Sequence, residues 1–152
     1  MGRNVALGLL AGGAGTAALN LVTYLDMATR GRPPSELPEQ AVTLGTEKAN
    51  VRLGDEDHAD NRKRALGALL GYVTGLGVGA AFGALRAHWR VPTGAAAGLL
   101  GLGAMAASDV PMTAAGLTNP RTWRAQDWLS DLIPHLAYGA ITALTYEAMA
   151  GR

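Results

Sequence analysis

The chain of 152 residues contains no cysteine. This absence excludes a disulfide framework, a zinc site built on thiolates and a thiol nucleophile. Charge is also scarce, because 13 basic and 12 acidic residues leave a net charge of only +1. A protein that binds nucleic acid through its charge carries a clear basic excess, so nucleic acid is not an expected partner.

Enzyme signatures are missing as well. The sequence has no serine nucleophile elbow, no glycine-rich phosphate loop after a strand and no pattern of ligands spaced for a metal. We therefore predict no catalytic residues, no metal site and no cofactor.

Four long stretches are almost free of charge. They comprise residues 5–25, 65–85, 94–117 and 132–150, and they contain only two ionisable acids, Asp109 and Glu147. At about 1.5 Å per residue, each stretch is long enough as a helix to cross a hydrocarbon core of about 30 Å. A soluble bundle would carry charge along the outer face of every helix. The sequence predicts one membrane domain, residues 1–152, that is all-α and forms a bundle of four transmembrane helices in contact with the lipid bilayer.

Two parts of this prediction have alternatives. The first stretch follows Arg3 and resembles a signal peptide, but its length favours a retained helix. The polar loop 27–64 contains Pro33, Pro34 and Pro38, after which either irregular chain or a short amphipathic helix on the membrane surface is expected.

Basic residues predict the orientation. With four spans, the end that holds both termini carries four of them, and the other end carries nine. The four are Arg3, Arg86, Arg90 and Arg152. The positive-inside rule then places the loop 27–64 in the cytoplasm and both termini outside.

Glycines recur at every fourth position of the second stretch. We call this set the glycine face; it comprises Gly67, Gly71, Gly75, Gly79 and Gly83. Residues four apart share one side of a helix, and small residues let two helices in lipid approach closely. The pattern predicts glycine-zipper packing, with Gly8 and Gly12 of the first stretch and Gly94 and Gly98 of the third in the same role. The partner helix belongs either to this chain or to another copy.

Polar residues inside the spans are candidate functional groups. Asp109 and His135 are expected at similar depths on two antiparallel helices, where they form either a relay for protons or cations or a structural clamp. Asn20 is expected to hydrogen-bond another helix. Glu147 lies near the end of the last span, so we expect it to reach solvent.

The connection before the last span combines aromatic and basic residues. Trp123 and Trp128 are typical of the lipid boundary, and Arg121 and Arg124 can contact phosphates. These four residues are candidates for a site that binds lipid headgroups.

Two parts of the chain resemble a known family. The residues Gly116, Leu117, Thr118 and Pro120, then Trp128, then Ser130, Asp131, His135 and Leu136 are similar to the C-terminal part of the YagU-like family of small inner-membrane proteins. Residues 8–12 and the pair Pro33-Pro34 resemble its N-terminal part. The resemblance implies a multi-pass protein of the bacterial cytoplasmic membrane, and it implies no catalytic residue.

Three functions follow from these features. The glycine face favours a structural or accessory component that binds another membrane protein or copies of itself. Asp109 and His135 favour a small channel or transporter for protons or cations. The connection 118–131 favours a lipid-binding protein.

Overall fold

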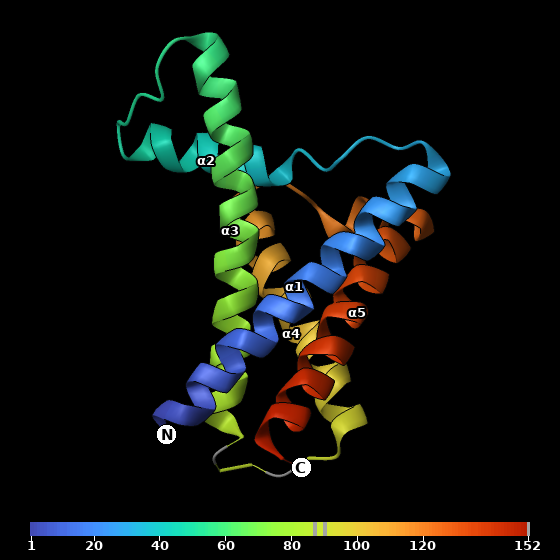
Figure 1. Ribbon diagram of the computed structural model, residues 1–152. Helices are drawn as coiled ribbons and strands as arrows, with labels where there is room; N and C mark the ends of the chain where they lie inside the picture. Colours follow the sequence, from blue (N-terminus) through green and yellow to red (C-terminus); the bar gives the residue numbers. More distant parts are fainter. Residues whose placement is uncertain (87, 90, 152) are drawn as a thin grey trace.

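The computed structural model describes residues 1–86, 88–89 and 91–151, and Arg90 and Arg152 of the orientation argument lie outside them. The described residues form five α-helices and one short 3-10 helix and no strand (Figure 1). They are α1 (Gly2–Arg30), α2 (Leu37–Lys48), α3 (Glu56–Leu85), α4 (Thr93–Ala114), η1 (Pro120–Thr122) and α5 (Ala125–Ala150). The predicted all-helical class is confirmed.

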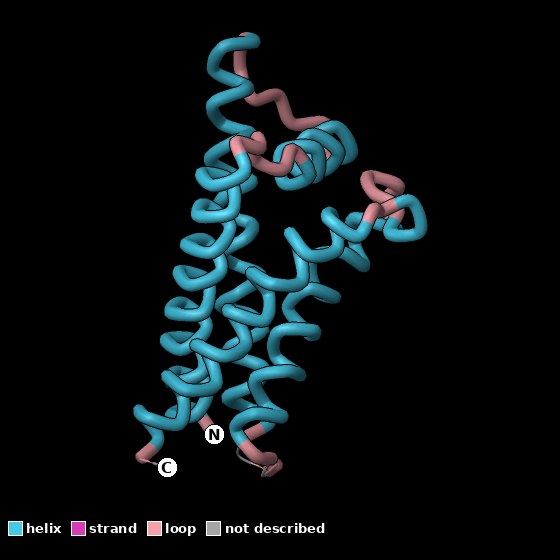
Figure 2. Tube along the Cα trace, turned by 90° about the vertical axis from the view of Figure 1, so that its right-hand side faces the viewer, coloured by secondary structure: helices cyan, strands magenta, loops and turns pink. Residues whose placement is uncertain are grey.

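The four long helices form an elongated bundle. Both termini and the connection between α3 and α4 lie at one end, which we call the terminal end. α2 and η1 lie toward the other end, which we call the loop end (Figures 1 and 2). α1 packs against both α3 and α5, and α5 also packs against α4. Consecutive long helices therefore run in opposite directions.

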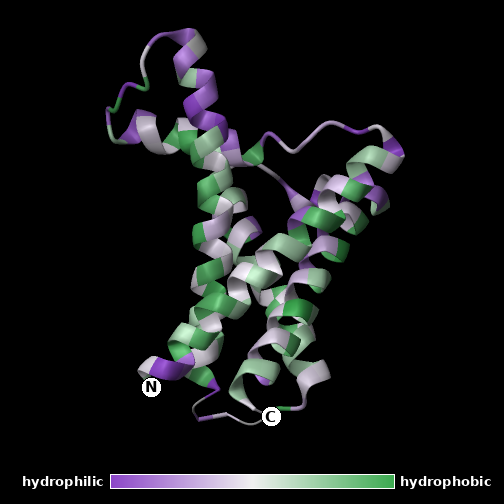
Figure 3. Cartoon of the chain, in the orientation of Figure 1, coloured by the Kyte–Doolittle hydropathy of each residue, from purple (hydrophilic) through white to green (hydrophobic). Residues whose placement is uncertain are grey.

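Hydrophilic residues gather at the loop end, on α2 and the first turns of α3 (Figure 3). Three helices are long and apolar enough to cross a membrane: α1, α4 and the part of α3 from His58 to Leu85. These helices indicate a membrane protein. The predicted fourth span lies in α5, which is not among the helices that are long and apolar enough to cross a membrane.

α1 and α3 cross through their glycines. A Cβ atom on Gly12 would lie 2.6 Å from the carbonyl oxygen of Gly75 and 3.1 Å from the Cα of Gly79. A Cβ on Gly79 would lie 2.7 Å from the Cα of Gly12. Gly8 and Gly83 face each other in the same way. The two backbones are thus in direct contact, and no side chain fits between them.

Not every predicted packing glycine meets another helix. Gly71, Gly94 and Gly98 have no such neighbour within 4 Å of an added Cβ among the described residues. The predicted role of these three in packing within the chain is therefore wrong. α1 and α3 diverge toward the loop end (Figure 1), so equal spacing along α3 does not bring Gly71 to α1. On α4 it is Gly101, and not Gly94 or Gly98, that contacts α5.

Gly67 contacts α2 and not a long helix. A Cβ there would lie 3.0 Å from Pro38 Cβ and 3.3 Å from Glu39 N. Nearby, Arg64 Nε lies 3.7 Å from Glu39 Oε1. The alternative of a short helix after the prolines is confirmed, and Gly67 is the point where that helix docks on α3.

Two glycines that the sequence pattern did not select join α4 to α5. A Cβ on Gly101 would lie 2.8 Å from the His135 carbonyl oxygen, and one on Gly139 would lie 2.9 Å from Gly101 Cα. The interface includes Leu100, Ala104 and Tyr138 among its buried side chains. This close packing places the polar residues of α5 inside the bundle.

The ends of α4 and α5 differ from the predicted spans. α4 ends at Ala114, because Gly116 adopts a left-handed φ of 73° that a helix cannot continue through. α5 starts earlier than residue 132, at Ala125, where the Asp127 carboxylate accepts a hydrogen bond of 2.9 Å from Arg124 N. This cap adds two turns to α5, and those turns contain Asp131.

Candidate functional site

Three ionisable residues meet between α4 and α5 toward the loop end of the bundle. His135 Nδ1 lies 3.3 Å from Asp131 Oδ1 and 2.8 Å from the Asp131 carbonyl oxygen. Asp109 of α4 is close enough to interact electrostatically with Asp131 and His135. The structure thus brings the two predicted residues, Asp109 and His135, together and adds Asp131 between them. We call these three residues the acid–histidine cluster.

The cluster is largely shielded from solvent. The side chains of His135 and Asp131 are 12% and 27% exposed. Asp131 Oδ2 is buried and has no hydrogen-bond partner among the described residues. A buried carboxylate oxygen without a partner is costly, and protonation or a hydrogen bond from water removes the cost.

The geometry defines how protons are arranged in the cluster. A carbonyl oxygen only accepts, so the contact to the Asp131 carbonyl requires that His135 Nδ1 carries a hydrogen. Nε2 is then the nitrogen that gains and loses a proton. Asp109 and Asp131 can hydrogen-bond only when one of the two carboxyl groups is protonated. The cluster can therefore hold a proton on a carboxyl oxygen or on His135.

A metal site is not formed there. Across the described part of the chain, no group of three or more His, Cys, Asp or Glu side chains has an arrangement that could hold a metal ion.

Asn20 does not join the cluster. It lies half-buried on α1, one turn beyond Thr16. Its side chain makes no hydrogen bond with the described residues, so the predicted interhelical hydrogen bond is not formed within them.

Glu147 is buried and does not reach solvent as the sequence predicted. It forms an ion pair with Arg86 Nη2, and the two side chains are 11% and 6% exposed. Arg86 Nη1 also donates to the carbonyl oxygens of Trp89 and Val91, at 3.1 Å each. The pair ties α5 to the connection after α3 at the terminal end.

The sequence contained a signal for both missed residues. Asp131 precedes His135 by four positions, a spacing that puts two residues on one side of a helix. Arg86 ends the second stretch and Glu147 lies near the end of the fourth, and these positions share one end of an antiparallel bundle.

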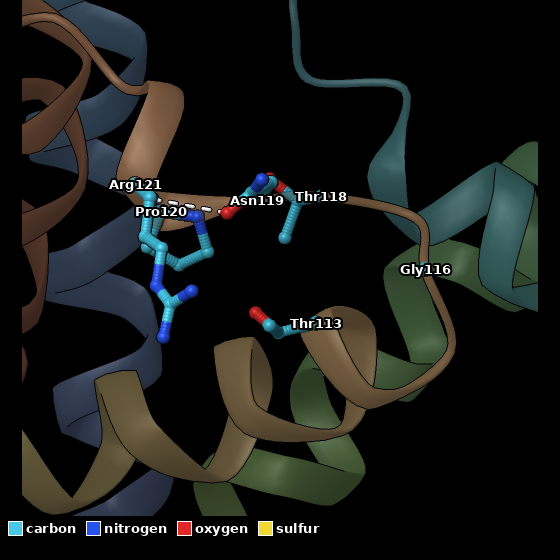
Figure 4. Close-up of a pocket in the computed structure, with 6 residues that line it drawn as sticks. All are labelled: Thr113, Gly116, Thr118, Asn119, Pro120 and Arg121. Carbon is cyan, nitrogen blue, oxygen red and sulfur yellow. Dashed lines mark hydrogen bonds between the residues drawn. The ribbon is translucent and has the colours of Figure 1, made fainter.

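The proposed headgroup residues surround the turn between α4 and α5. The Trp123 and Trp128 rings pack edge to face with centroids 5.0 Å apart, and Trp123 Nε1 donates to Thr118 Oγ1 at 2.9 Å. An open pocket of about 630 Å³ lies beside them, lined by Thr113, Gly116, Thr118, Asn119, Pro120 and Arg121 (Figure 4). Arg124 does not line this pocket. Its Nε atom lies 3.5 Å from Asp127 Oδ2. The structure thus separates the two arginines that the sequence grouped together.

α1 is joined to α5 at the same end. Arg30 Nη1 lies 3.1 Å from Asp26 Oδ1 and donates to Ser130 Oγ at 2.8 Å. Arg32 Nε also contacts Asp26, at 2.5 Å. This network holds the start of α5, and with it Asp131, against the end of α1.

Comparison of the chain with family models, curated proteins and solved structures finds no match.

Proposed function

We propose that this protein spans the membrane four times and moves protons across it through the acid–histidine cluster. The observation that carries the proposal is the shielded contact of His135 with Asp131 on α5, with Asp109 of α4 in electrostatic range of both. Ionisable groups within a membrane are costly to bury and commonly serve ion or proton transfer.

The proposal needs α5 as a fourth span. α5 has 26 residues, or about 39 Å of helix at about 1.5 Å per residue, which exceeds the hydrocarbon thickness of about 30 Å. It is packed against both α1 and α4, each of which is apolar enough to span. Its acids and His135 lower its hydropathy, and much of this polar surface faces other helices and not lipid. Both termini then lie on one side, and the basic residues of the loop favour the cytoplasm for the other side.

The geometry gives less support to an accessory subunit. That hypothesis relied on the glycine face as a docking surface for another protein. α1 of the same chain covers Gly75, Gly79 and Gly83, and α2 contacts Gly67. A partner protein would have to bind elsewhere on the bundle.

The proposal is tested by proton flux into proteoliposomes that contain the purified protein and an internal pH-sensitive dye. We expect a flux above that of empty liposomes, and we expect Asp109→Asn to lower it at least tenfold while the protein keeps its assembly state. Asp127→Asn is the matched control, because Asp127 is also on α5 but caps its exposed start.

Three results would contradict the proposal. The first is a wild-type flux equal to that of empty liposomes. The second is an Asp109→Asn flux equal to wild type. The third is a flux of Na⁺ or K⁺ that Asp109→Asn abolishes without any proton movement, which would assign the site to cations.

A further inference from the structure

The buried polar atoms that lack a partner lie on α5 or beside its C-terminal end. Among the described residues they are Asp131 Oδ2, Thr142 Oγ1, Tyr146 Oη and Arg86 Nε. Three belong to α5, and the fourth belongs to the residue that pairs with Glu147 of α5. Each such atom costs free energy unless water or another group satisfies it.

These residues form a line along one side of α5. Asp131, His135, Tyr138, Thr142 and Tyr146 follow one another at intervals of four, three, four and four positions, which keeps them on a single helical face. We call these five residues the polar line. From Asp131 to Glu147 the helix rises about 24 Å at about 1.5 Å per residue, which is most of a hydrocarbon core of about 30 Å.

The polar line faces the interior of the bundle. Tyr138, Thr142 and Tyr146 are 1%, 0% and 0% exposed. The Tyr138 hydroxyl donates to the Gly75 carbonyl oxygen at 2.6 Å, and Thr142 Oγ1 lies against Gly15 of α1. The Tyr146 ring packs on Phe82 with centroids 5.1 Å apart. The glycine face of α3 thus brings the Gly75 carbonyl oxygen to the hydroxyl group of Tyr138.

We propose that the polar line is a hydrated proton path that connects the acid–histidine cluster to the Arg86–Glu147 pair at the terminal end. This inference rests on the proposed function and adds the route that protons take through the protein. Side chains four positions apart on a helix have Cβ atoms about 5–6 Å apart, so water molecules must bridge successive hydroxyl groups. Buried water is stable where it has two to four polar partners, and the unpartnered oxygens together with the glycine carbonyls supply them.

Proton transfer along this line conserves atoms and charge. A hydroxyl oxygen accepts a proton from the water on one side and releases its own proton to the water on the other side. Rotation of the hydroxyl and of the waters then restores the starting arrangement. No redox partner is needed, and one proton leaves for each proton that enters.

The decisive variants remove an unpartnered hydroxyl and keep the shape of the side chain. Thr142→Val and Tyr146→Phe are expected to lower the proteoliposome flux at least tenfold. Because the deleted groups have no protein partner, the melting temperature is expected to stay equal or rise. Thr142→Ser restores the hydroxyl and is expected to keep the flux. Tyr72→Phe is a matched control off the line, because Tyr72 belongs to α3 and is 43% exposed.

The outcomes distinguish a failure of the proposed proton path from a failure of the proposed function. If Asp109→Asn abolishes flux and both hydroxyl variants conduct like wild type, the path is wrong and the proposed function stands. If the wild-type protein conducts no protons, both are wrong. A loss of flux in Thr142→Val that Thr142→Ser does not share supports the path.

A second measurement does not depend on flux. Because the chain has no cysteine, Thr142→Cys puts a single thiol on the line, and Ala143→Cys puts one at a neighbouring site that is also 0% exposed. Silver ions reach buried thiols only through water. We expect them to react with the protein carrying Thr142→Cys and not with the one carrying Ala143→Cys. Equal protection of both thiols would show that the line is dry and would overturn the path.

Discussion

The two faces that α1 and α5 bring to the centre of the bundle are built in opposite ways. At the α1–α3 crossing, the backbones touch because Gly8 and Gly12 of α1 face Gly79 and Gly83 of α3. On α5, tyrosine, threonine, histidine and acidic side chains enter the interior. In lipid, apolar surface between helices gives no hydrophobic driving force, so close packing and hydrogen bonds must hold helices together. The glycines of α1 and α3 therefore have a second role, because they leave the space in which the polar side chains of α5 fit.

The largest effect is expected at the glycine crossing. In Gly79→Leu, the new side chain would start 2.7 Å from Gly12 Cα, so α1 must move away from α3. Overpacking costs about 1–3 kcal/mol where side chains can repack. Here the neighbour is backbone, which cannot repack, so the α1–α3 crossing must separate and the cost exceeds that of breaking the buried ion pair. We expect loss of the monodisperse, folded protein in detergent, measured by size-exclusion chromatography and thermal melting. Gly77→Leu is the control, because nothing lies within 4 Å of a Cβ there. Equal melting temperatures for the two variants would contradict the packing.

The second largest effect is expected at the buried ion pair. Glu147→Gln leaves the Arg86 guanidinium buried without a counter-charge, and breaking a buried pair costs about 3–5 kcal/mol. The double variant Arg86→Met with Glu147→Gln removes the orphaned charge, so we expect it to melt at a higher temperature than Glu147→Gln alone. Glu47→Gln on the exposed part of α2 is the control. A double variant no more stable than the single one would show that the pair is not coupled.

The smallest effect is expected at the start of α5. The backbone hydrogen bond from Arg124 holds the pKa of Asp127 below its usual value of 3.8. A depressed carboxyl pKa stabilises the fold above the pKa of the unfolded chain, and the stabilisation is lost as pH falls through the folded value. Asp127→Asn should therefore lower the melting temperature slightly at pH 7 and leave it unchanged near pH 2. A larger difference at pH 2 than at pH 7 would contradict the role of the cap.

Much of the fold was predictable, because helix length and hydrophobicity are local properties. The absence of charge from four stretches located the four long helices, and the prolines marked the start of a separate short helix, with Pro33 and Pro34 before it and Pro38 in its first turn. The ends of the helices were less predictable. Asp127 caps α5 two turns before the predicted start, and the left-handed backbone of Gly116 ends α4 early. Both features depend on the local conformation of a turn, which the hydropathy of the sequence does not reveal.

The sequence predicted only part of the candidate site. Asp109 and His135 were identified because ionisable residues within apolar helices are costly, and that cost is visible in the sequence. Asp131 was missed because it lay outside the predicted span. Glu147 was assigned to solvent because its partner, Arg86, is 61 positions away in the chain.

By itself the sequence determined that this chain is helical and suited to lipid, because segregation of charge and the spacing of glycines are properties of the order of residues. The tertiary structure alone decided which glycines touch another helix and which face outward, because that depends on where the helices cross. It also decided that the hydroxyl and ionisable groups of α5 lie on a buried face, because burial is a relation between helices. The proposed proton path depends on this packing of α5 against the other helices.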